Sequence, residues 1–561
     1  MLKFAKSQVR WLSLVCVLTI LVPLLAACGA PATPAPATQA SGAQAPAATQ
    51  APAATQAPAA TQAQAAATQA PASTAKKVLR MSRQGEPFSP FIPWQIDDNP
   101  ALFISVNVYD SLLRMTPDGL GVQPGLATKW ESAADGLSWT FTLRDNIKYS
   151  DGSPMKPEDV QASILAVAKS KKSSWAANYA AIKDVQIVDP KTIKIILSQP
   201  FAALPSVMAM FCAAILPADL VKASEAADFD VTTAWKTRGT GAYYSESWKK
   251  GDPIILKRNP NYWNGTPAVD EVDIDYVPDD NTRILKLQGG ETDVIDFVPL
   301  SQVASISGQG NITAKPFTIA QMYTIILNNT VKPLDDLKVR QALNYATNKE
   351  AIAKTVFFGQ AKAANAPIPP GMYQNKDLTG YPFDLAKAKQ LMAASSTPNG
   401  FKLEMQVRSG NADYSNIATI LKDEWSKIGV DVNLVNLETS VVRTNYRSGN
   451  YQSQPSGWTN DMNDPTQIVN YEMNSNPGMQ FAMWTRYNNP DLNAAIAKAD
   501  VELDPAKRQQ MYYDIQTKFQ ADAPLVWTVY APATAAWQNY VEGFLIDGLS
   551  YYRFENVKIN K

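Results

Sequence analysis

Apolar positions follow two different spacings in the first half of the chain, and together they predict both strands and helices. Short apolar or alternating stretches predict strands at residues 78–81, 139–144, 191–197, 254–258, 272–277 and 293–297. Apolar residues spaced by three and four predict helices at residues 101–113, 157–169 and 281–287. Pro157 in the first turn, with acidic residues close behind it, favours a helix start there.

Strands and helices alternate more regularly in the second half of the chain. The expected elements are strand 323–327, helix 337–346, strand 401–407, helix 414–428, strand 431–437, helix 505–520 and strand 524–530. Alternation of this kind predicts an α/β lobe. The last strand has no local partner, so it is expected to pair with a distant part of the chain.

The first 28 residues have the pattern of an exported lipoprotein. Lys3, Lys6 and Arg10 precede a 17-residue uncharged stretch at 11–27, which is typical of a signal peptide and too short for a membrane span. The sequence Leu-Ala-Ala before Cys28 resembles a lipobox. This resemblance implies a lipid on Cys28 and a mature chain on the outer face of the cytoplasmic membrane. An apolar helix with an accidental cysteine is the alternative.

Residues 28–75 differ in composition from everything that follows. They are almost entirely Ala, Pro, Thr, Gln and Ser, and the hexad Ala-Pro-Ala-Ala-Thr-Gln occurs three times in succession from Ala45. Without large apolar side chains, no core can offset the entropy of ordering this segment. We interpret it as a disordered tether that holds the domain away from a membrane. A disordered ligand for a partner is the alternative.

Composition excludes several classes of function. The chain has 51 basic and 51 acidic residues, so we expect no nucleic-acid partner. It has no histidine, which excludes Ser-His-Asp and Cys-His catalysis and removes the commonest metal ligand. No phosphate-binding glycine loop or cysteine cluster is present, and Cys212 is the single cysteine after Cys28. We therefore expect no enzyme activity, metal, cofactor or internal disulfide.

A set of short motifs resembles one protein family. The run from Trp139 to Pro154, continuing to Glu158-Asp159-Val160, resembles the signature of bacterial extracellular solute-binding proteins of family 5. Further blocks resemble the same family in the same order, at residues 239–243, 258–263, 290–293, 327–329, 339–345 and 427–430. The resemblance covers about residues 78–545. This family contains the peptide, dipeptide and nickel receptors of ABC importers.

The resemblance implies an α/β, bilobed periplasmic-binding-protein fold (type II, cluster C) with an extra lobe inserted in the first domain. The expected parts are signal peptide 1–27, tether 28–75, lobe I at 76–109, 199–321 and 526–561, the extra lobe at 110–198, and lobe III at 322–525. The hinge is expected near residues 321–322 and 522–525. Strand 524–530 is accordingly expected to rejoin lobe I.

The resemblance also implies two charged ligand contacts. Peptide receptors of the family place an aspartate of a Gly-Trp-x-x-Asp segment against the ligand's ammonium, and Asp461 matches it after Trp458. Asp464 before Pro465 is more typical of a helix cap. Arg408 resembles the arginine that dipeptide receptors set against the peptide carboxylate, and it follows strand 401–407, where α/β lobes place ligand contacts. Arg443 and Arg447 are alternatives to it.

Other contacts are expected from aromatic residues and one loop. Trp458, Tyr414 and Tyr530 are candidate walls of side-chain pockets. Asn99, in the proline-rich loop with Asp97 and Asp98, is expected to offer backbone hydrogen bonds. Pro455 and Tyr446 stand where the resemblance would place cations of long-peptide receptors, which favours short ligands.

The sequence therefore predicts a monomeric, lipid-anchored receptor that delivers di- or tripeptides to the permease subunits of an ABC importer. The resemblance leaves an oligosaccharide receptor of the same family as an alternative, because some members of that family bind sugars on aromatic surfaces, and this chain has 13 Trp and 22 Tyr. Nickel and haem are less favoured without histidine. A sensing or adhesion lipoprotein without transport is an alternative of a different class. A secreted hydrolase would need a nucleophile and base or a pair of acids, and we find no such arrangement.

Overall fold

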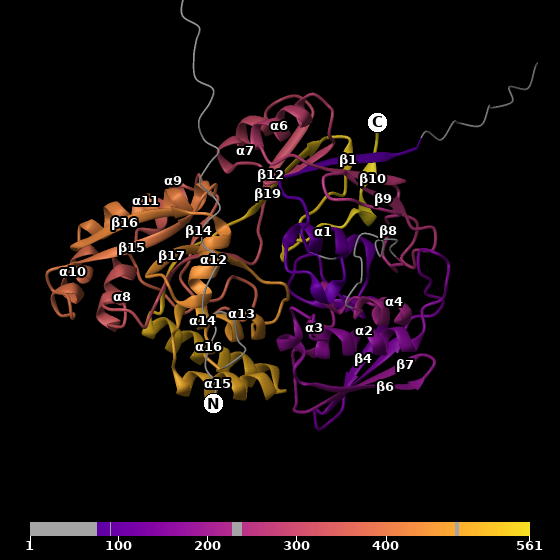
Figure 1. Ribbon diagram of the computed structural model, residues 1–561, viewed down its shortest axis with the longest axis horizontal. Helices are drawn as coiled ribbons and strands as arrows, with labels where there is room; N and C mark the ends of the chain where they lie inside the picture. Colours follow the sequence, from indigo (N-terminus) through magenta and orange to yellow (C-terminus); the bar gives the residue numbers. More distant parts are fainter. Residues whose placement is uncertain (1–75, 90, 227–237, 477–481) are drawn as a thin grey trace, which may run out of the picture. The chain divides into compact units, whose positions relative to one another are not determined.

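Three larger β-sheets form the framework of the computed structural model, which describes residues 76–89, 91–226, 238–476 and 482–561 (Figure 1). All of these residues belong to one unit, Thr74–Lys561. The predicted signal peptide, Cys28 and the tether lie outside the described residues. Within the described ranges, no helix combines the length and apolarity that crossing a membrane requires.

The first sheet has seven strands, and its centre is built from parallel neighbours of β1. β1 pairs in parallel with both β10 and β11, while β19 enters antiparallel between β11 and β12. The order is β12 (Ile312–Phe317), β19 (Ala533–Gln538), β11 (Val294–Asp296), β1 (Val78–Arg83), β10 (Glu271–Tyr276), β9 (Ile254–Arg258) and β8 (Tyr243–Tyr244).

The second sheet has six strands drawn from the second half of the chain. The order is β14 (Lys362–Ala363), β18 (Leu525–Tyr530), β13 (Gln321–Leu327), β17 (Ser453–Thr459), β15 (Phe401–Arg408) and β16 (Val430–Leu437). β13 is antiparallel to both neighbours, and β15 is parallel to β16 and β17. This is the α/β region that the alternating pattern predicted.

The chain passes between these two sheets at two adjacent places. The first passage joins β12 to β13 through residues 318–320, and the second joins β18 to β19 through residues 531–532. β12 pairs with β19 in one sheet and β13 pairs with β18 in the other, so the two passages run side by side.

The prediction that strand 524–530 rejoins lobe I is wrong. β18 pairs with β13 in the six-stranded sheet, and it is β19 that returns to the seven-stranded sheet. All six residues of β18 are buried, so both of its faces are apolar, and its sequence holds no sign of which sheet it enters. The second passage therefore lies at residues 531–532 and not at 522–525.

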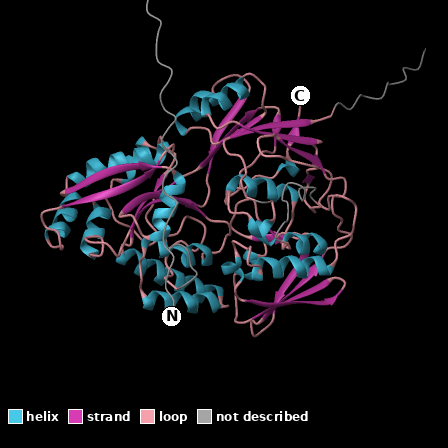
Figure 2. Ribbon diagram, in the orientation of Figure 1, coloured by secondary structure: helices cyan, strands magenta, loops and turns pink. Residues whose placement is uncertain are grey.

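The third sheet is small and antiparallel throughout (Figure 2). Its strands are β4 (Ala127–Ser132), β5 (Ser138–Leu143), β7 (Thr192–Leu197) and β6 (Ile182–Asp189), and two further strand pairs are β2 (Leu113–Met115) with β3 (Val122–Pro124) and β20 (Val541–Glu542) with β21 (Lys558–Ile559). Burial alternates along β7, as expected of a sheet with one face on the core. Helix α2 packs against β6 and β7.

Helices cover the sheets with their apolar sides. α6 and α7 pack beside β11 and β12, and α8, α9 and α11 share one core with the six-stranded sheet. The helices are α1 (Asn99–Val108), α2 (Pro157–Lys169), α3 (Leu204–Val207), α4 (Ala218–Ser224), α6 (Asp280–Gln288), α7 (Leu300–Ser307), α8 (Leu337–Tyr345), α9 (Lys349–Thr355), α10 (Leu385–Ala393), α11 (Ala412–Ser426), α12 (Thr439–Ser448), α13 (Thr466–Glu472), α14 (Ala482–Thr485), α15 (Pro490–Val501) and α16 (Pro505–Asp522). Short 3-10 helices lie at Pro93–Gln95, Ala176–Tyr179, Phe211–Ala213 and Phe554–Asn556.

The helix predicted at 101–113 is shorter than expected. α1 ends at Val108 because Tyr109 adopts an extended backbone, and β2 begins at Leu113. Its N-cap is Asp98, whose side chain accepts a hydrogen bond from Ala101 N. The cap uses one carboxylate oxygen and Ser89 N binds the other, so Asp98 serves the local fold.

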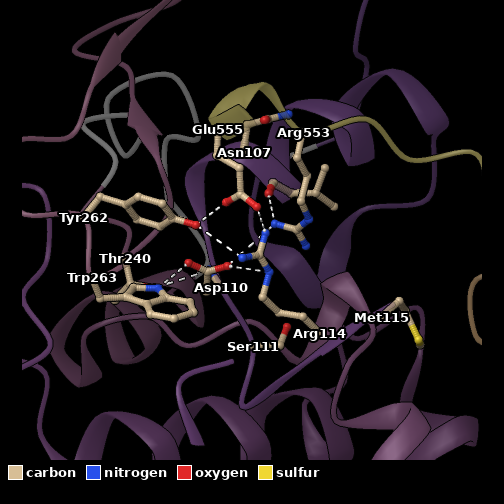
Figure 3. Close-up of polar contacts among 12 residues, drawn as sticks. Asn107, Asp110, Ser111, Arg114, Met115, Thr240, Tyr262, Trp263, Arg553 and Glu555 are labelled. Carbon is tan, nitrogen blue, oxygen red and sulfur yellow. Dashed lines mark hydrogen bonds and ion pairs between the residues drawn. The ribbon is translucent and has the colours of Figure 1, made fainter. Parts of the chain in front are cut away.

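A buried ion network joins the end of α1 to the C-terminal segment (Figure 3). Arg114 Nη2 lies 2.6 Å from Glu555 Oε1, and Arg114 Nε lies 3.7 Å from Asp110 Oδ1. Arg553 Nη1 is 3.6 Å from the same Asp110 oxygen, and Trp263 Nε1 donates to Asp110 Oδ2 at 2.9 Å. Burial raises the pKa of Asp110, whereas the two arginines outweigh burial at Glu555 and lower its pKa. The network depends on its cations.

We predict that Arg114→Met destabilises the protein by about 3–5 kcal/mol, because it leaves two buried carboxylates short of a cation. Urea-induced unfolding measures this free energy. The matched control is Lys257→Met, which removes an exposed pair with Glu246 and is expected to cost no more than about 1 kcal/mol. Equal losses for the two variants would contradict a stabilising role of the network.

Candidate ligand-binding site

One edge of the six-stranded sheet gathers most of the predicted contact residues. β15 and β17 are parallel, so their carboxyl ends, at Arg408 and Thr459, lie at the same edge. β13 runs the opposite way and begins there, and β18 ends there at Tyr530. Trp458 and Tyr530 each pair with Met322. The structure therefore places Arg408, Trp458 and Tyr530 at one edge of the sheet, and Arg408 lies at the carboxyl end of its strand, where α/β lobes commonly place ligand contacts.

Cross-strand pairing also defines one face of this sheet, because residues directly opposite in an antiparallel pair point to the same side. Trp458 and Tyr530 flank Met322 in the first row, Ser456 and Trp527 flank Thr324 in the second, and Gln454 and Leu525 flank Ile326 in the third. We call this surface the Trp458 face; its residues are Met322, Thr324, Ile326, Gln454, Ser456, Trp458, Leu525, Trp527 and Tyr530.

Asp461 follows β17 at this edge and is partly buried. Gln467 of α13 binds it twice: Gln467 Nε2 donates to Asp461 Oδ2 at 2.9 Å, and Asp461 N donates to Gln467 Oε1 at 2.9 Å. Tyr551 Oη donates to the main-chain oxygen of Asp461 at 3.2 Å and lies 3.5 Å from Oδ1. These contacts fix the carboxylate between α13 and the C-terminal segment.

The Asp461 carboxylate has no cationic partner in the part of the chain that the structure describes. Burial raises its pKa from 3.8 to about 6, and the hydrogen bonds from Gln467 and Tyr551 only partly oppose this. Within the described ranges no lysine or arginine forms an ion pair with Asp461. A buried carboxylate of this kind gains when a cation is brought to it from outside the protein.

A group of aromatic side chains extends from Tyr551, whose hydroxyl contacts Asp461. Phe211 packs edge to face with both Trp175 and Tyr551, at ring-centroid distances of 5.1 and 6.4 Å. Trp175 Nε1 donates to Ile96 O at 2.7 Å, which ties the proline-rich loop to this group. Tyr471 Oη donates to Asn178 Oδ1 at 3.1 Å, so α13 also contacts the first half of the chain. Residues from both halves of the chain therefore meet in this aromatic group, which adjoins Asp461 through Tyr551.

Asp464 has a structural role, as the sequence indicated. Arg508 Nη1 and Nη2 lie 2.6 and 2.8 Å from its two carboxylate oxygens, and Thr466 N donates to Oδ1 at 2.9 Å in the first turn of α13. Burial would raise the pKa of Asp464, but the adjacent guanidinium outweighs it and lowers the pKa. Its carboxylate is thus already satisfied within the protein.

Arg408 differs from Arg508 because it has no acidic partner among the described residues. Its Nε is buried and makes no hydrogen bond there, and its guanidinium carbon lies 5.5 Å from the centre of the Tyr414 ring. The alternatives Arg443 and Arg447 are exposed on α12. Arg408 is therefore the better placed of the three to bind an anion at this edge.

The aromatic candidates divide between the two faces of the sheet. Trp458 stacks on Tyr471 at 5.3 Å on the Trp458 face. The hydroxyl of Tyr530 on the same face donates to Ala366 O at 2.6 Å and so holds the segment after β14. Tyr414 is only 6% exposed and lies in the core between the other face and α11, so we do not retain it as a pocket wall.

Asn99 is exposed in the first turn of α1 and makes no side-chain hydrogen bond within the described ranges. Its neighbour Asp98 caps the helix, and Ser89 Oγ donates to Asp97 Oδ1 at 2.6 Å. The loop contacts the aromatic group beside Asp461 through Ile96, whose main-chain oxygen accepts a hydrogen bond from Trp175.

Sequence reasoning missed three polar residues near this site. Glu472 at the end of α13 is fully buried, and neither of its carboxylate oxygens has a hydrogen-bond partner among the described residues. Gln454 and Ser456 on the Trp458 face are likewise buried, with unpartnered side-chain atoms. The available signal was an acidic residue between the apolar residues Tyr471 and Met473, shortly after Ile468 and Val469. No cluster of three potential metal ligands occurs in the described part of the chain.

Comparison with known proteins agrees with this architecture. A sequence model of the bacterial extracellular solute-binding proteins, family 5, middle region, matches residues 121–480. The chain is 29% identical over 495 residues to the dipeptide-binding protein of Escherichia coli (strain K12), covering 82% of this chain and 92% of that protein. It is 28% identical over 493 residues to heme-binding protein A of Haemophilus influenzae, covering 82% and 90% respectively.

The structural comparison gives the same result. The ABC transporter-associated periplasmic binding protein DppA from Helicobacter pylori, solved in complex with the peptide STSA, superposes with a TM-score of 0.76 at 25% identity and covers 86% of this chain and 98% of that one. The periplasmic-binding-protein fold expected from the sequence is therefore confirmed. Because the family match spans more than half of the chain, this protein belongs to the bacterial extracellular solute-binding proteins of family 5, which are transport receptors and not enzymes.

Proposed function

We propose that this protein is a lipid-anchored receptor of an ABC importer that captures di- or tripeptides and delivers them to the permease subunits. Membership of the family supports a receptor role, and a dipeptide-binding protein and a peptide-bound structure are among its relatives. The observation that carries the peptide assignment is the carboxylate of Asp461, which is partly buried, contacts Tyr551 and forms no ion pair with any described lysine or arginine.

A peptide supplies the charges that this site lacks. Its α-ammonium would pair with Asp461, since a charge leaving water needs a partner of opposite sign. Its carboxylate would pair with Arg408, whose guanidinium can bind a carboxylate through two parallel hydrogen bonds. Trp458 and Tyr530 would border the ligand from the Trp458 face, and Asn99 remains a candidate backbone contact. Pro455 and Tyr446, in place of further cations, favour a short ligand.

Ligand binding would be coupled to closure of two lobes about residues 318–320 and 531–532. In an open form Asp461 would be hydrated, and closure would bury it against Tyr551 of the C-terminal segment. A rise in the pKa of Asp461 from 3.8 to about 6 corresponds to about 3 kcal/mol at neutral pH. A bound ammonium would offset this cost, so the closed form would be favoured when ligand is present.

The lipid anchor is the second part of the proposal. A diacylated Cys28 followed by residues 29–75 would hold a monomeric domain at the outer face of the cytoplasmic membrane, within reach of the permease. The support is the Leu-Ala-Ala-Cys sequence after a basic and apolar leader.

We predict that Asp461→Asn weakens binding of free-amine dipeptides by about 2–5 kcal/mol, the usual cost of removing one partner of a buried charge pair. The binding free energy of N-acetylated dipeptides should change far less, because these ligands carry no ammonium group. Arg408→Gln should affect the carboxyl end of the dipeptide, and it should reduce the preference for dipeptides with a free carboxylate over their C-terminal amides. Isothermal titration calorimetry with the four ligand forms measures both effects.

The matched control for this series is Asp491→Asn. Asp491 is exposed on α15 and has one distant partner, Lys518 at 3.4 Å, so no change in binding is expected. If Asp461→Asn still prefers the free amine by the wild-type margin, the Asp461 assignment is wrong. If the wild-type protein binds oligosaccharides and no peptide, the sugar-receptor alternative replaces the peptide proposal.

We predict that Cys28→Ala prevents lipid attachment, so that the protein accumulates as an unprocessed precursor or is released from the cell. Metabolic labelling with a radioactive fatty acid measures this directly, with Cys16→Ala as the control that should label normally. Equal labelling of wild type and Cys28→Ala would rule out the lipoprotein assignment.

A further inference from the structure

Glu472 is a buried acid that the proposed peptide anchors do not use. It ends α13, in which all seven residues are buried, and its own exposed fraction is 0%. Burial raises its pKa to about 8, and no charged neighbour among the described residues contributes to that shift. Both carboxylate oxygens lack a hydrogen-bond partner within the described ranges. A carboxyl group in this state is costly unless something binds it.

The position of Glu472 is next to the Trp458 face. Tyr471, the preceding residue, stacks on Trp458 and packs in one apolar cluster with Ile326 of the same face. α13 therefore covers the part of the sheet that lies between Trp458 and Ile326. On the opposite strand of the face, burial and, to a smaller extent, the charge of Glu472 raise the pKa of Tyr530 to about 12.

Two more buried side chains of this face have unpartnered polar atoms. Among the residues that the structure describes, Gln454 makes no hydrogen bond through either its amide nitrogen or its amide oxygen, and Ser456 makes none through its hydroxyl. Ser456 lies two residues from Trp458, and Gln454 two residues further, on the same side of β17. Native proteins leave few buried polar atoms without a hydrogen-bond partner. Several such atoms on one face therefore indicate that a polar group of a ligand binds there.

We propose that Glu472, Gln454 and Ser456 form a subsite that binds a cationic side chain, ammonium or guanidinium, of the captured peptide. The subsite adjoins Trp458 and so extends the site that Asp461 begins; it rests on the proposed peptide function. A carboxylate is the group that best satisfies a cation, and the Gln454 amide oxygen and Ser456 hydroxyl accept further hydrogen bonds from it. Lysine- or arginine-containing dipeptides are the expected ligands.

The proposal is tested by calorimetry with two dipeptides that differ in one charge, Ala-Lys and Ala-norleucine. Wild-type protein should bind Ala-Lys at least about tenfold more tightly, and Glu472→Gln should abolish this difference while leaving Ala-norleucine affinity almost unchanged. The matched control is Glu424→Gln. Glu424 is also a buried glutamate, but it lies on α11 and its carboxylate already accepts a hydrogen bond from Asn348 N. Glu424→Gln should retain the wild-type discrimination.

Proton release gives a second readout in the same titrations. At pH 7 a carboxyl group with a pKa of about 8 is about 90% protonated, and a bound cation lowers that pKa. Ala-Lys should therefore release close to one proton from the wild-type protein. This number is obtained by comparing the binding enthalpy in phosphate buffer with that in Tris buffer. Ala-norleucine should release at most about 0.1 proton, from Asp461. Glu472→Gln should abolish the extra release.

The outcomes separate the two proposals. If Ala-norleucine binds and Ala-Lys shows neither tighter binding nor extra proton release, the subsite is wrong while the peptide function stands. An equal loss of affinity for both dipeptides in Glu472→Gln would also contradict the subsite, since it would indicate that Glu472 has a general structural role. If neither dipeptide binds wild type, the peptide function itself has failed and the subsite fails with it.

Discussion

The paired passage of the chain between two sheets is the constraint on which the rest of this structure depends. Residues 318–320 and 531–532 are the two connections, and each is flanked by strands that pair with one another on both sides. The connections are short and adjacent, so a few backbone torsions would suffice to move one sheet relative to the other. β13 starts directly after residues 318–320, so the edge of the six-stranded sheet at which β13 starts lies beside the two connections. The candidate site lies at that edge.

Electrostatics explain how such a hinge could respond to a ligand. Asp461 is held by Gln467 and Tyr551 but has no cation among the described residues, so its burial raises its pKa to about 6. In the proposed mechanism the ligand ammonium compensates for that burial, and closure without ligand is penalised. Asp464, three residues away, provides the contrast: its pKa is lowered because Arg508 compensates for its burial. The protein itself satisfies one acid and leaves the other available.

The sequence predicted local elements and lineage well and long-range pairing less well. Helix 157–169 coincides with α2, and the ordered family motifs led to the confirmed fold. The sheet that receives β18 could not be read from its sequence, because both faces of this strand are apolar. Tyr414 shares a helical spacing with Ile417 and Leu421, which indicated a core position more strongly than a pocket wall. Glu472 was missed because a single acid in an apolar run has no partner that sequence can identify.

Closure about the paired connections is the central claim, and small-angle X-ray scattering of the protein with and without a bound dipeptide tests it most directly. The account predicts a smaller radius of gyration at saturating ligand, because the ammonium at Asp461 favours the closed form. In the Asp461→Asn variant, burial of that side chain no longer carries a charge penalty. The radius of gyration of this variant should therefore change less when ligand is added. A wild-type scattering profile that is unchanged at saturation would contradict ligand-driven closure.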